Sequence, residues 1–150
     1  MNAPHPLIRR IEEKDFVRVS DITNYYFPHV GTTPSKIAKR LSKGFDYFVA
    51  VVDGVVAGFA DYKLMERKVK LMGLAVDCEF RQIGIGSALL SKICEFAARE
   101  GKSEIYLQVK QNNLPAIKLY QSNGFVLKRK VDKWAERYYL MSKVLSRSAL

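Results

Sequence analysis

Short apolar runs bounded by turn residues recur along the chain, and this pattern predicts a protein rich in β-strands. The clearest signal is the hairpin formed by residues 47–52 and 55–62, because the Asp-Gly pair between them favours a tight turn. The same reasoning predicts the remaining strands at residues 7–11, 69–76, 104–109, 125–134 and 137–144. The last two would form a hairpin that turns at Ala135-Glu136.

Capping and stop signals predict three shorter helices, at residues 16–26, 36–42 and 114–122. Asp15 is expected to cap the first helix and Ser35 the second. Pro28 would stop the first helix, and Gly124 would end the third. Residues 145–150 are expected to form a loose tail.

A long amphipathic helix is predicted over residues 85–100, where apolar residues recur at Ile85, Leu89, Ile93 and Ala97. It is preceded by a glycine-containing turn, Arg81-Gln82-Ile83-Gly84-Ile85-Gly86. Glycines let backbone approach a ligand closely, and the free amides at a helix N-terminus attract anions. Arg81 adds a fixed positive charge with a planar set of donors. The segment therefore predicts a phosphate cradle at a strand-to-helix junction.

Two familiar phosphate motifs do not fit this segment. A nucleoside-triphosphate P-loop needs a lysine after its last glycine, whereas Gly86 is followed by Ser87-Ala88. A dinucleotide fingerprint needs a third glycine where this chain has Leu89. It also needs an acidic residue at the end of the next strand, and Glu104 begins that strand instead.

The pattern that does fit is R-x-x-G-x-G after a strand that ends in Leu-Ala-Val. A second pattern, N-x-x-A-x-x-x-Y-x-x-x-G-F, runs from Asn113 to Phe125. With both patterns in this order, the chain resembles the GNAT superfamily of N-acetyltransferases over residues 7–145 of a single domain, 1–150. The resemblance implies an α/β fold with a mixed, mostly antiparallel seven-stranded sheet and about four helices. The fourth and fifth strands would be parallel and would splay apart.

The same resemblance implies acetyl-coenzyme A (acetyl-CoA) as the cosubstrate. The glycine-containing turn would hold its pyrophosphate, and the end of the fourth strand would pair with the pantetheine arm inside the splay. Asn113 would hydrogen-bond the pantetheine, and it could at the same time be the N-cap of the helix that follows. The expected cofactor-binding residues are Leu74, Ala75, Val76, Arg81, Gln82, Ile83, Gly84, Ile85, Gly86, Ser87, Asn113 and Tyr120.

Acetyl transfer to an amine needs a proton donor for the leaving thiolate and an acceptor for the amine proton. By resemblance Tyr120 is the expected catalytic acid, although a tyrosine at this position could simply pack the helix. The family's usual base positions hold Lys70 and Gln108, neither of which suits a base. The other candidates lie outside the family pattern: Glu66, Asp61, His29, Tyr139 and Glu79. We expect ordered water or backbone carbonyls to carry the proton away.

The composition narrows the class of partner. The chain has 150 residues and a formal net charge of +10, which suits a polyanion such as coenzyme A but also describes solvated lysines. A basic nucleic-acid- or ribosome-associated protein is a competing class, but no recognised motif supports nucleic acid as a partner. No apolar run reaches the roughly 18 residues of a membrane helix, and no signal peptide is recognised, so no membrane partner is expected. Isolated histidines predict no metal site, and two cysteines without a framework favour a reducing, cytoplasmic setting.

The acceptor is expected to be a primary amine, with a protein or peptide amine favoured over a small amine or polyamine. Tyr25-Tyr26-Phe27-Pro28 loosely resembles the Phe-Pro loop of protein N-terminal acetyltransferases, although these rings could equally fill the core. A non-catalytic acyl-CoA-binding regulatory module is the alternative function, because the usual base residues are missing. The acceptor, the acyl length and the oligomeric state, including a homodimer, stay open.

Overall fold

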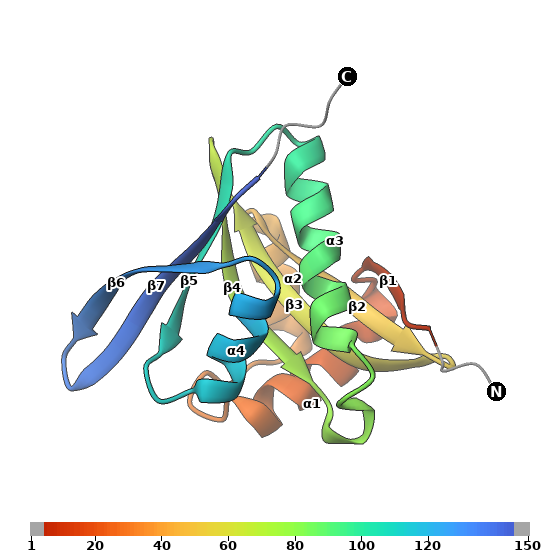
Figure 1. Ribbon diagram of the computed structural model, residues 1–150. Helices are drawn as coiled ribbons and strands as arrows, with labels where there is room; N and C mark the ends of the chain where they lie inside the picture. Colours follow the sequence, from red (N-terminus) through yellow and green to blue (C-terminus); the bar gives the residue numbers. More distant parts are fainter. Residues whose placement is uncertain (1–4, 146–150) are drawn as a thin grey trace.

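The computed structural model describes residues 5–145, which form a seven-stranded sheet with helices on both faces (Figure 1). The strand order is β1-β2-β3-β4-β5-β7-β6. Strands β4 and β5 are parallel, and every other neighbouring pair of described strands is antiparallel. The predicted fold class is therefore confirmed.

The observed elements lie within two residues of the predicted ones. The strands are β1 (Leu7–Arg10), β2 (Phe45–Val52), β3 (Val55–Leu64), β4 (Lys68–Val76), β5 (Glu104–Lys110), β6 (Val126–Lys133) and β7 (Glu136–Val144). The helices are α1 (Phe16–Tyr26), α2 (Pro34–Ser42), α3 (Ile85–Arg99) and α4 (Leu114–Ser122), with 3-10 turns η1 (Glu13–Asp15) and η2 (Cys78–Phe80). The β2–β3 hairpin turns at Asp53 and Gly54, both at positive φ, as its sequence predicts.

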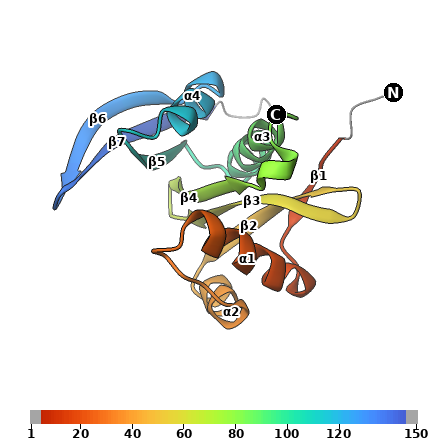
Figure 2. The same cartoon turned by 90° about the horizontal axis from the view of Figure 1, so that it is seen from below.

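The sheet separates two hydrophobic cores. Figure 2 shows α3 and α4 on one face and α1 and α2 on the other. Leu89 and Ile93 of α3 pack with Tyr62 of β3 on the first face, whereas Phe59 of β3 belongs to the core under α1 and α2. Because successive residues of a strand point to opposite faces, Asp61 shares the face of Phe59. The two faces thus offer different side chains to any ligand that enters between the strands.

Strands β4 and β5 pair only over their first residues, from Lys68–Glu104 to Lys70–Tyr106. Beyond these pairs β4 keeps its β3 partners, and β5 keeps its β7 partners, but the two strands no longer pair with each other. A bulge at Met72 of β4 lies at the beginning of this divergence. The predicted splay is therefore confirmed, and it leaves a backbone edge open on each strand.

Two predicted helix caps are wrong. Helix α2 begins at Pro34, and the cap is Thr33, whose hydroxyl accepts from the Lys36 amide at 3.2 Å, so Ser35 lies inside the helix. The proline keeps the residue before it extended, which is the conformation an N-cap requires. Asp15 makes no side-chain cap for α1, because its carboxylate accepts from Arg9 at 2.7 Å and from the Glu12 amide at 2.8 Å.

The last hairpin and the tail also differ from expectation. The hairpin turns at Trp134 and Ala135, one residue earlier than predicted, since Lys133 pairs with Glu136 and Trp134 takes a positive φ. Leu145 is buried rather than loose, and its amide donates to the Ser103 carbonyl at 2.9 Å. The rest of the predicted tail, 146–150, lies outside the described residues.

Two further properties follow from the described part of the chain. Between residues 5 and 145, no helix has both the length and the apolarity needed to cross a bilayer. Over the same residues, His, Cys, Asp and Glu side chains do not gather in threes as a metal site would require.

Candidate functional site

The N-terminus of α3 is open to a ligand. Its N-cap is Gly84, which has a φ of +80° and offers no side chain to the amides of the first turn. A Cβ placed on Gly84 would meet no described protein atom within 4 Å, so space lies directly in front of the helix. Gln82 also takes a positive φ, of 68°, which turns the chain sharply after η2. The geometry is that of an anion cradle.

Gly86, which the sequence predicts as a ligand contact, also lies where α3 packs closely against α4. A Cβ there would lie 3.0 Å from a methyl group of Leu119 on α4, so the glycine lets the two helices touch. Ser87, one residue further, accepts a hydrogen bond at 3.1 Å from the side-chain amide of Asn123 at the end of α4. These contacts fix the beginning of α3 against α4. Ile85 points into the core, and Ile83 is partly exposed.

Arg81 lies near the cradle but points back toward β4. Its Nε donates to the Val76 carbonyl at 3.3 Å, and its guanidinium lies 5.1 Å from the centre of the Tyr26 ring. The Tyr26 hydroxyl in turn accepts from the Cys78 amide at 2.7 Å. Arg81 is exposed, and its bond to Val76 lies at the surface.

The end of β4 borders the split. Leu74, Ala75 and Val76 pair with β3 on one side, and their other edge faces away from any described strand. The side chains of Leu74 and Val76 pack on the α3 face, and Ala75 packs on the α1–α2 face. Their backbone groups on the free edge are therefore available to a ligand that lies in the split.

The second motif forms α4 on the same side of the sheet as α3. The Asn113 side chain accepts from the Ala116 amide at 3.3 Å, which confirms it as the N-cap and leaves its amide N–H groups for another partner. Tyr120 is buried against Phe125, and burial raises the pKa of its phenol to about 12, with a smaller contribution from the charge of Asp61. Tyr120 therefore stays protonated at neutral pH.

The predicted acid opens onto a large cleft of about 840 Å³. Its walls come from α1, the loop that follows α1, α2, strands β2 to β5, α4 and β7. Lys36, Lys39 and Arg40 of α2 lie along one wall together with Lys43, the residue after the helix, and Asp61 is the one carboxylate among the described residues of the lining. The cleft thus joins the α1–α2 face to the split between β4 and β5.

Asp61 is held in this cleft by an ion pair. Arg40 donates from Nη2 to Oδ2 of Asp61 at 2.7 Å and from Nε to the hydroxyl of Tyr47 at 3.0 Å. The Arg40 guanidinium also lies 4.1 Å from the centre of the Phe45 ring. Burial raises the pKa of Asp61 to about 6, although the charge and hydrogen bond of Arg40 act in the opposite direction.

The usual base positions are occupied as the sequence indicates. Lys70 is the last residue of β4 that pairs with β5, and the Gln108 side chain accepts a hydrogen bond from Lys133 at 2.9 Å. Of the other candidates, His29 and Asp61 line the cleft, Tyr139 packs against the α3 core, and Glu66 and Glu79 lie outside the cleft lining. Asp61 is the charged residue within the buried, largely apolar run of β3. This charge in an apolar run was the sequence feature that could have singled out Asp61 as a functional residue.

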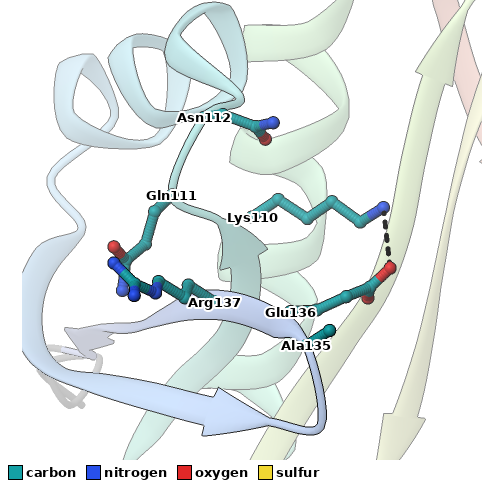
Figure 3. A pocket seen from close by; sticks show the side chains of 6 residues that line it. All are labelled: Lys110, Gln111, Asn112, Ala135, Glu136 and Arg137. Atoms are coloured by element: carbon teal, nitrogen blue, oxygen red, sulfur yellow. Dashed lines mark ion pairs between the residues drawn. The ribbon is translucent and has the colours of Figure 1, made fainter.

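A smaller cavity of about 320 Å³ lies where β5 ends against the β6–β7 turn (Figure 3). Lys110 of β5 forms an ion pair at 3.5 Å with Glu136, and Gln111 donates to the Tyr138 carbonyl at 3.1 Å. The Tyr138 hydroxyl also donates to Glu136. These contacts hold the turn end of the β6–β7 hairpin against β5, beside the large cleft that Lys110 also lines.

Known N-acetyltransferases resemble this chain in sequence. N-acetyltransferase 8 of Homo sapiens is 34% identical over 111 residues, 69% of this chain and 49% of that protein. The ribosomal protein bS18-alanine N-acetyltransferase of Escherichia coli K12 is 32% identical over 78 residues, 52% of this chain and 53% of that protein. The chain therefore spans about half the length of the curated relatives it matches.

Solved structures share the fold. The Escherichia coli ribosomal-protein-S18-alanine N-acetyltransferase has a TM-score of 0.83 at 22% identity, over 97% of both chains. The acetyltransferase yncA of Salmonella typhimurium, solved with its cofactor acetyl-CoA, has a TM-score of 0.79 at 22% identity, also over 97% of both chains. The model of the acetyltransferase (GNAT) family matches residues 9–125. The chain belongs to the GNAT family of acetyltransferases.

Proposed function

We propose that the chain transfers an acetyl group from acetyl-CoA to a primary amine. The observation that carries this proposal is the open N-terminus of α3 beside the split between β4 and β5. The helix end offers free amides to a diphosphate, and the split offers an unpaired strand edge to an extended arm that contains amide groups. Membership of the family is consistent with both.

Each part of the cosubstrate has a matching group on the protein. The diphosphate would bind the first-turn amides of α3, with Gly84 leaving room and Arg81 supplying charge. The pantetheine arm would pair with β4 from Leu74 to Val76. The side-chain N–H groups of Asn113, which its cap bond leaves free, would reach the same arm from α4.

The arrangement supports direct attack by the amine on the thioester. A backbone amide where β4 diverges would stabilise the charge that develops on the carbonyl oxygen. The thiolate would leave toward α4, where Tyr120 holds a proton at neutral pH because burial raises the pKa of its phenol. Tyr120 is thus the acid of the proposed reaction.

A protein or peptide amine is the acceptor we favour. The cleft reaches from the split to the loop after α1 and to α2, which provides room for residues that follow the reacting amine. One sequence relative is named for acetylation of an alanine of a ribosomal protein. Among the aromatic residues expected near the acceptor, Tyr26 and Phe27 line this cleft, whereas Tyr25 is exposed.

The test is turnover with a panel of amines, followed by release of the CoA thiol and by the mass of the product. The panel contains peptides with a free N-terminus, the same peptides with a blocked N-terminus, polyamines and amino acids. We expect acetylation of the free peptides. Turnover of polyamines alone would refute the peptide assignment. CoA binding without turnover of any amine would instead support the non-catalytic acyl-CoA-binding module.

A further inference from the structure

We propose that Asp61 is the catalytic base, the group that takes the proton from the ammonium of the acceptor. This inference rests on the proposed function and goes beyond it, because Asp61 belongs to neither sequence motif. It replaces the water-mediated route expected from sequence. The two positions where a base would usually be sought hold Lys70 and Gln108.

Asp61 lies directly beside β4. Asp61 pairs with Gly73, the residue before Leu74, and residues directly opposite in an antiparallel pair share a face. Gly73 has no side chain on that face, and the carboxylate lies in the free space: a Cβ on Gly73 would be 3.0 Å from Oδ1 of Asp61. The carboxylate therefore lies over β4, beside the edge that opens into the split.

Acid and base approach the split from opposite faces of the sheet. Asp61 lies on the face covered by α1 and α2, since it binds Arg40 of α2. Tyr120 belongs to the core on the α3 face. Both line the same cleft, and the charge of Asp61 contributes to the raised pKa of Tyr120. An amine that enters from the α1–α2 face would meet the base, and the thiolate would leave toward the acid.

The carboxylate of Asp61 is both buried and oriented. Asp61 is 8% exposed, and Arg40 orients one oxygen while the other faces Gly73. Because burial raises its pKa to about 6, the group is ionised at neutral pH and is still basic enough to accept a proton. The groups that face it are Arg40 of α2, Tyr47 of β2 and Tyr120 of α4. Further titratable groups of the cleft are Lys36 and Lys39 of α2, Lys43 just after it, Lys110 of β5, Tyr138 of β7, Tyr26 of α1 and His29.

The proton balance of the reaction is complete with these two groups. One ammonium proton moves to Asp61, and the nitrogen lone pair forms the C–N bond. The C–S bond breaks, and the thiolate takes the hydroxyl proton of Tyr120. The second nitrogen proton returns to the tyrosinate through solvent, and Asp61 releases its proton to bulk water. The products are an amide, the free CoA thiol and one proton.

The rival explanation is that the Arg40–Asp61 pair only holds α2 on the sheet. The test compares Asp61→Asn with Asp15→Asn, because Asp15 is also buried and its ion pair with Arg9 also measures 2.7 Å, but it lies outside the cleft. For each variant we would measure CoA affinity, thermal stability, and kcat/KM against pH with an acetylatable peptide.

The shape of the pH profile separates the two explanations. With Asp61 as base the ammonium form can react, so wild-type kcat/KM should rise near pH 6 and should already be close to its plateau below pH 8, about the pKa of an α-ammonium. Asp61→Asn should lower kcat/KM at pH 7 by about a hundredfold or more and should remove the limb near pH 6. Its rate should then increase through about pH 8, because only free amine reacts. Asp15→Asn should keep the wild-type profile.

A second variant covers the case in which Asp61→Asn does not fold. Arg40 is a positioning residue, and its charge lowers the pKa of Asp61. Arg40→Gln should therefore move the acidic limb upward by about one pH unit or more. A limb that stays in place in Arg40→Gln, or that persists in Asp61→Asn, would overturn the assignment of Asp61. An inactive wild type would refute the proposed function instead.

Discussion

The side-chain amide of Asn123, at the end of α4, donates to the hydroxyl of Ser87 in the first turn of α3 at 3.1 Å. The same amide group donates to the Leu119 carbonyl at 2.9 Å, so one side chain near the end of the second motif is fixed on α4 and also binds the residue that directly follows the first motif. The two motifs lie more than twenty residues apart in sequence, and this contact makes them one structural unit.

Replacement of Asn123 by alanine should weaken this unit. The loss of two part-buried hydrogen bonds predicts a decrease in the free energy of unfolding of about 1–3 kcal/mol. Because the cradle at the start of α3 would be held less firmly, we also expect acetyl-CoA affinity to decrease. Denaturant unfolding and calorimetric titration would measure the two effects. Unchanged affinity in a destabilised Asn123→Ala variant would show that the contact serves the fold alone.

Tyr120→Phe should affect the rate and little else. The ring would keep its contact with Phe125, so stability and CoA affinity should change little, while kcat should fall by about tenfold to a hundredfold. Because the pKa of Tyr120 is raised to about 12, its own ionisation should not limit the rate below about pH 10. Wild-type kcat in Tyr120→Phe would assign the tyrosine to packing.

The two buried aspartates, Asp61 and Asp15, should make pH-dependent contributions of opposite sign to the free energy of unfolding. The folded pKa of Asp61 is raised to about 6, so the ionised form is disfavoured in the folded state and stability falls as pH rises from about 4 to 6. Asp61→Asn should remove this decrease. Between pH 4 and pH 8, the free energy of unfolding of the variant should therefore gain on the order of 1–3 kcal/mol relative to that of the wild type.

Asp15 provides the opposite case in the same experiment. Burial would raise its pKa, but hydrogen bonds from Arg9 and the Glu12 amide outweigh burial and lower it. Its stabilising contribution is therefore present above the unfolded pKa and lost as pH falls through the folded pKa. Asp15→Asn should thus destabilise the protein at pH 8 and lose this effect in acid. Parallel pH dependence of the two variants would contradict both assignments.

The charge of the acceptor should matter. Lys36 and Lys39 of α2 and Lys43 just after the helix lie on the cleft wall, and none of them takes part in an ion pair within residues 5–145. We expect peptides with acidic residues after the reacting amine to have lower KM than neutral ones, with an advantage that shrinks at high salt. Lys36→Glu/Lys39→Glu should reverse the preference. A KM independent of peptide charge would exclude this role.

Much of the fold was predictable because its signals are local. The Asp53-Gly54 turn, the stripe from Ile85 to Ala97 and the two glycine-containing motifs specify their elements from neighbouring residues. The observed cap of α2 differs from the predicted one because the preference of Pro34 for the first helical position outweighs the capping preference of Ser35. The packing role of Gly86 was not predictable, because only the packed structure shows Leu119 opposite it.

The candidate site was predictable where a motif carries it and not where it depends on strand register. Asp61 was one candidate base among several, since its sequence neighbours do not show that Arg40 reaches it from α2. Nor does sequence show that Gly73 lies opposite and leaves room for its carboxylate. Both facts arise from pairing across the sheet, which hydrophobic periodicity does not specify in detail.

We predict that the N-terminus of α3 binds the diphosphate of acetyl-CoA, and Gly84→Val examines this binding. Gly101→Val is the matched control, because Gly84 has a φ of +80° and Gly101 has a φ of +74°. A Cβ at either position would lie more than 4 Å from any neighbouring group, and the two glycines flank opposite ends of α3. The backbone strain, about 1–3 kcal/mol, should therefore be similar in both variants. In a calorimetric titration we predict that Gly84→Val loses acetyl-CoA affinity by about tenfold or more, while Gly101→Val binds as the wild type does. Equal affinities for the two variants would contradict the account.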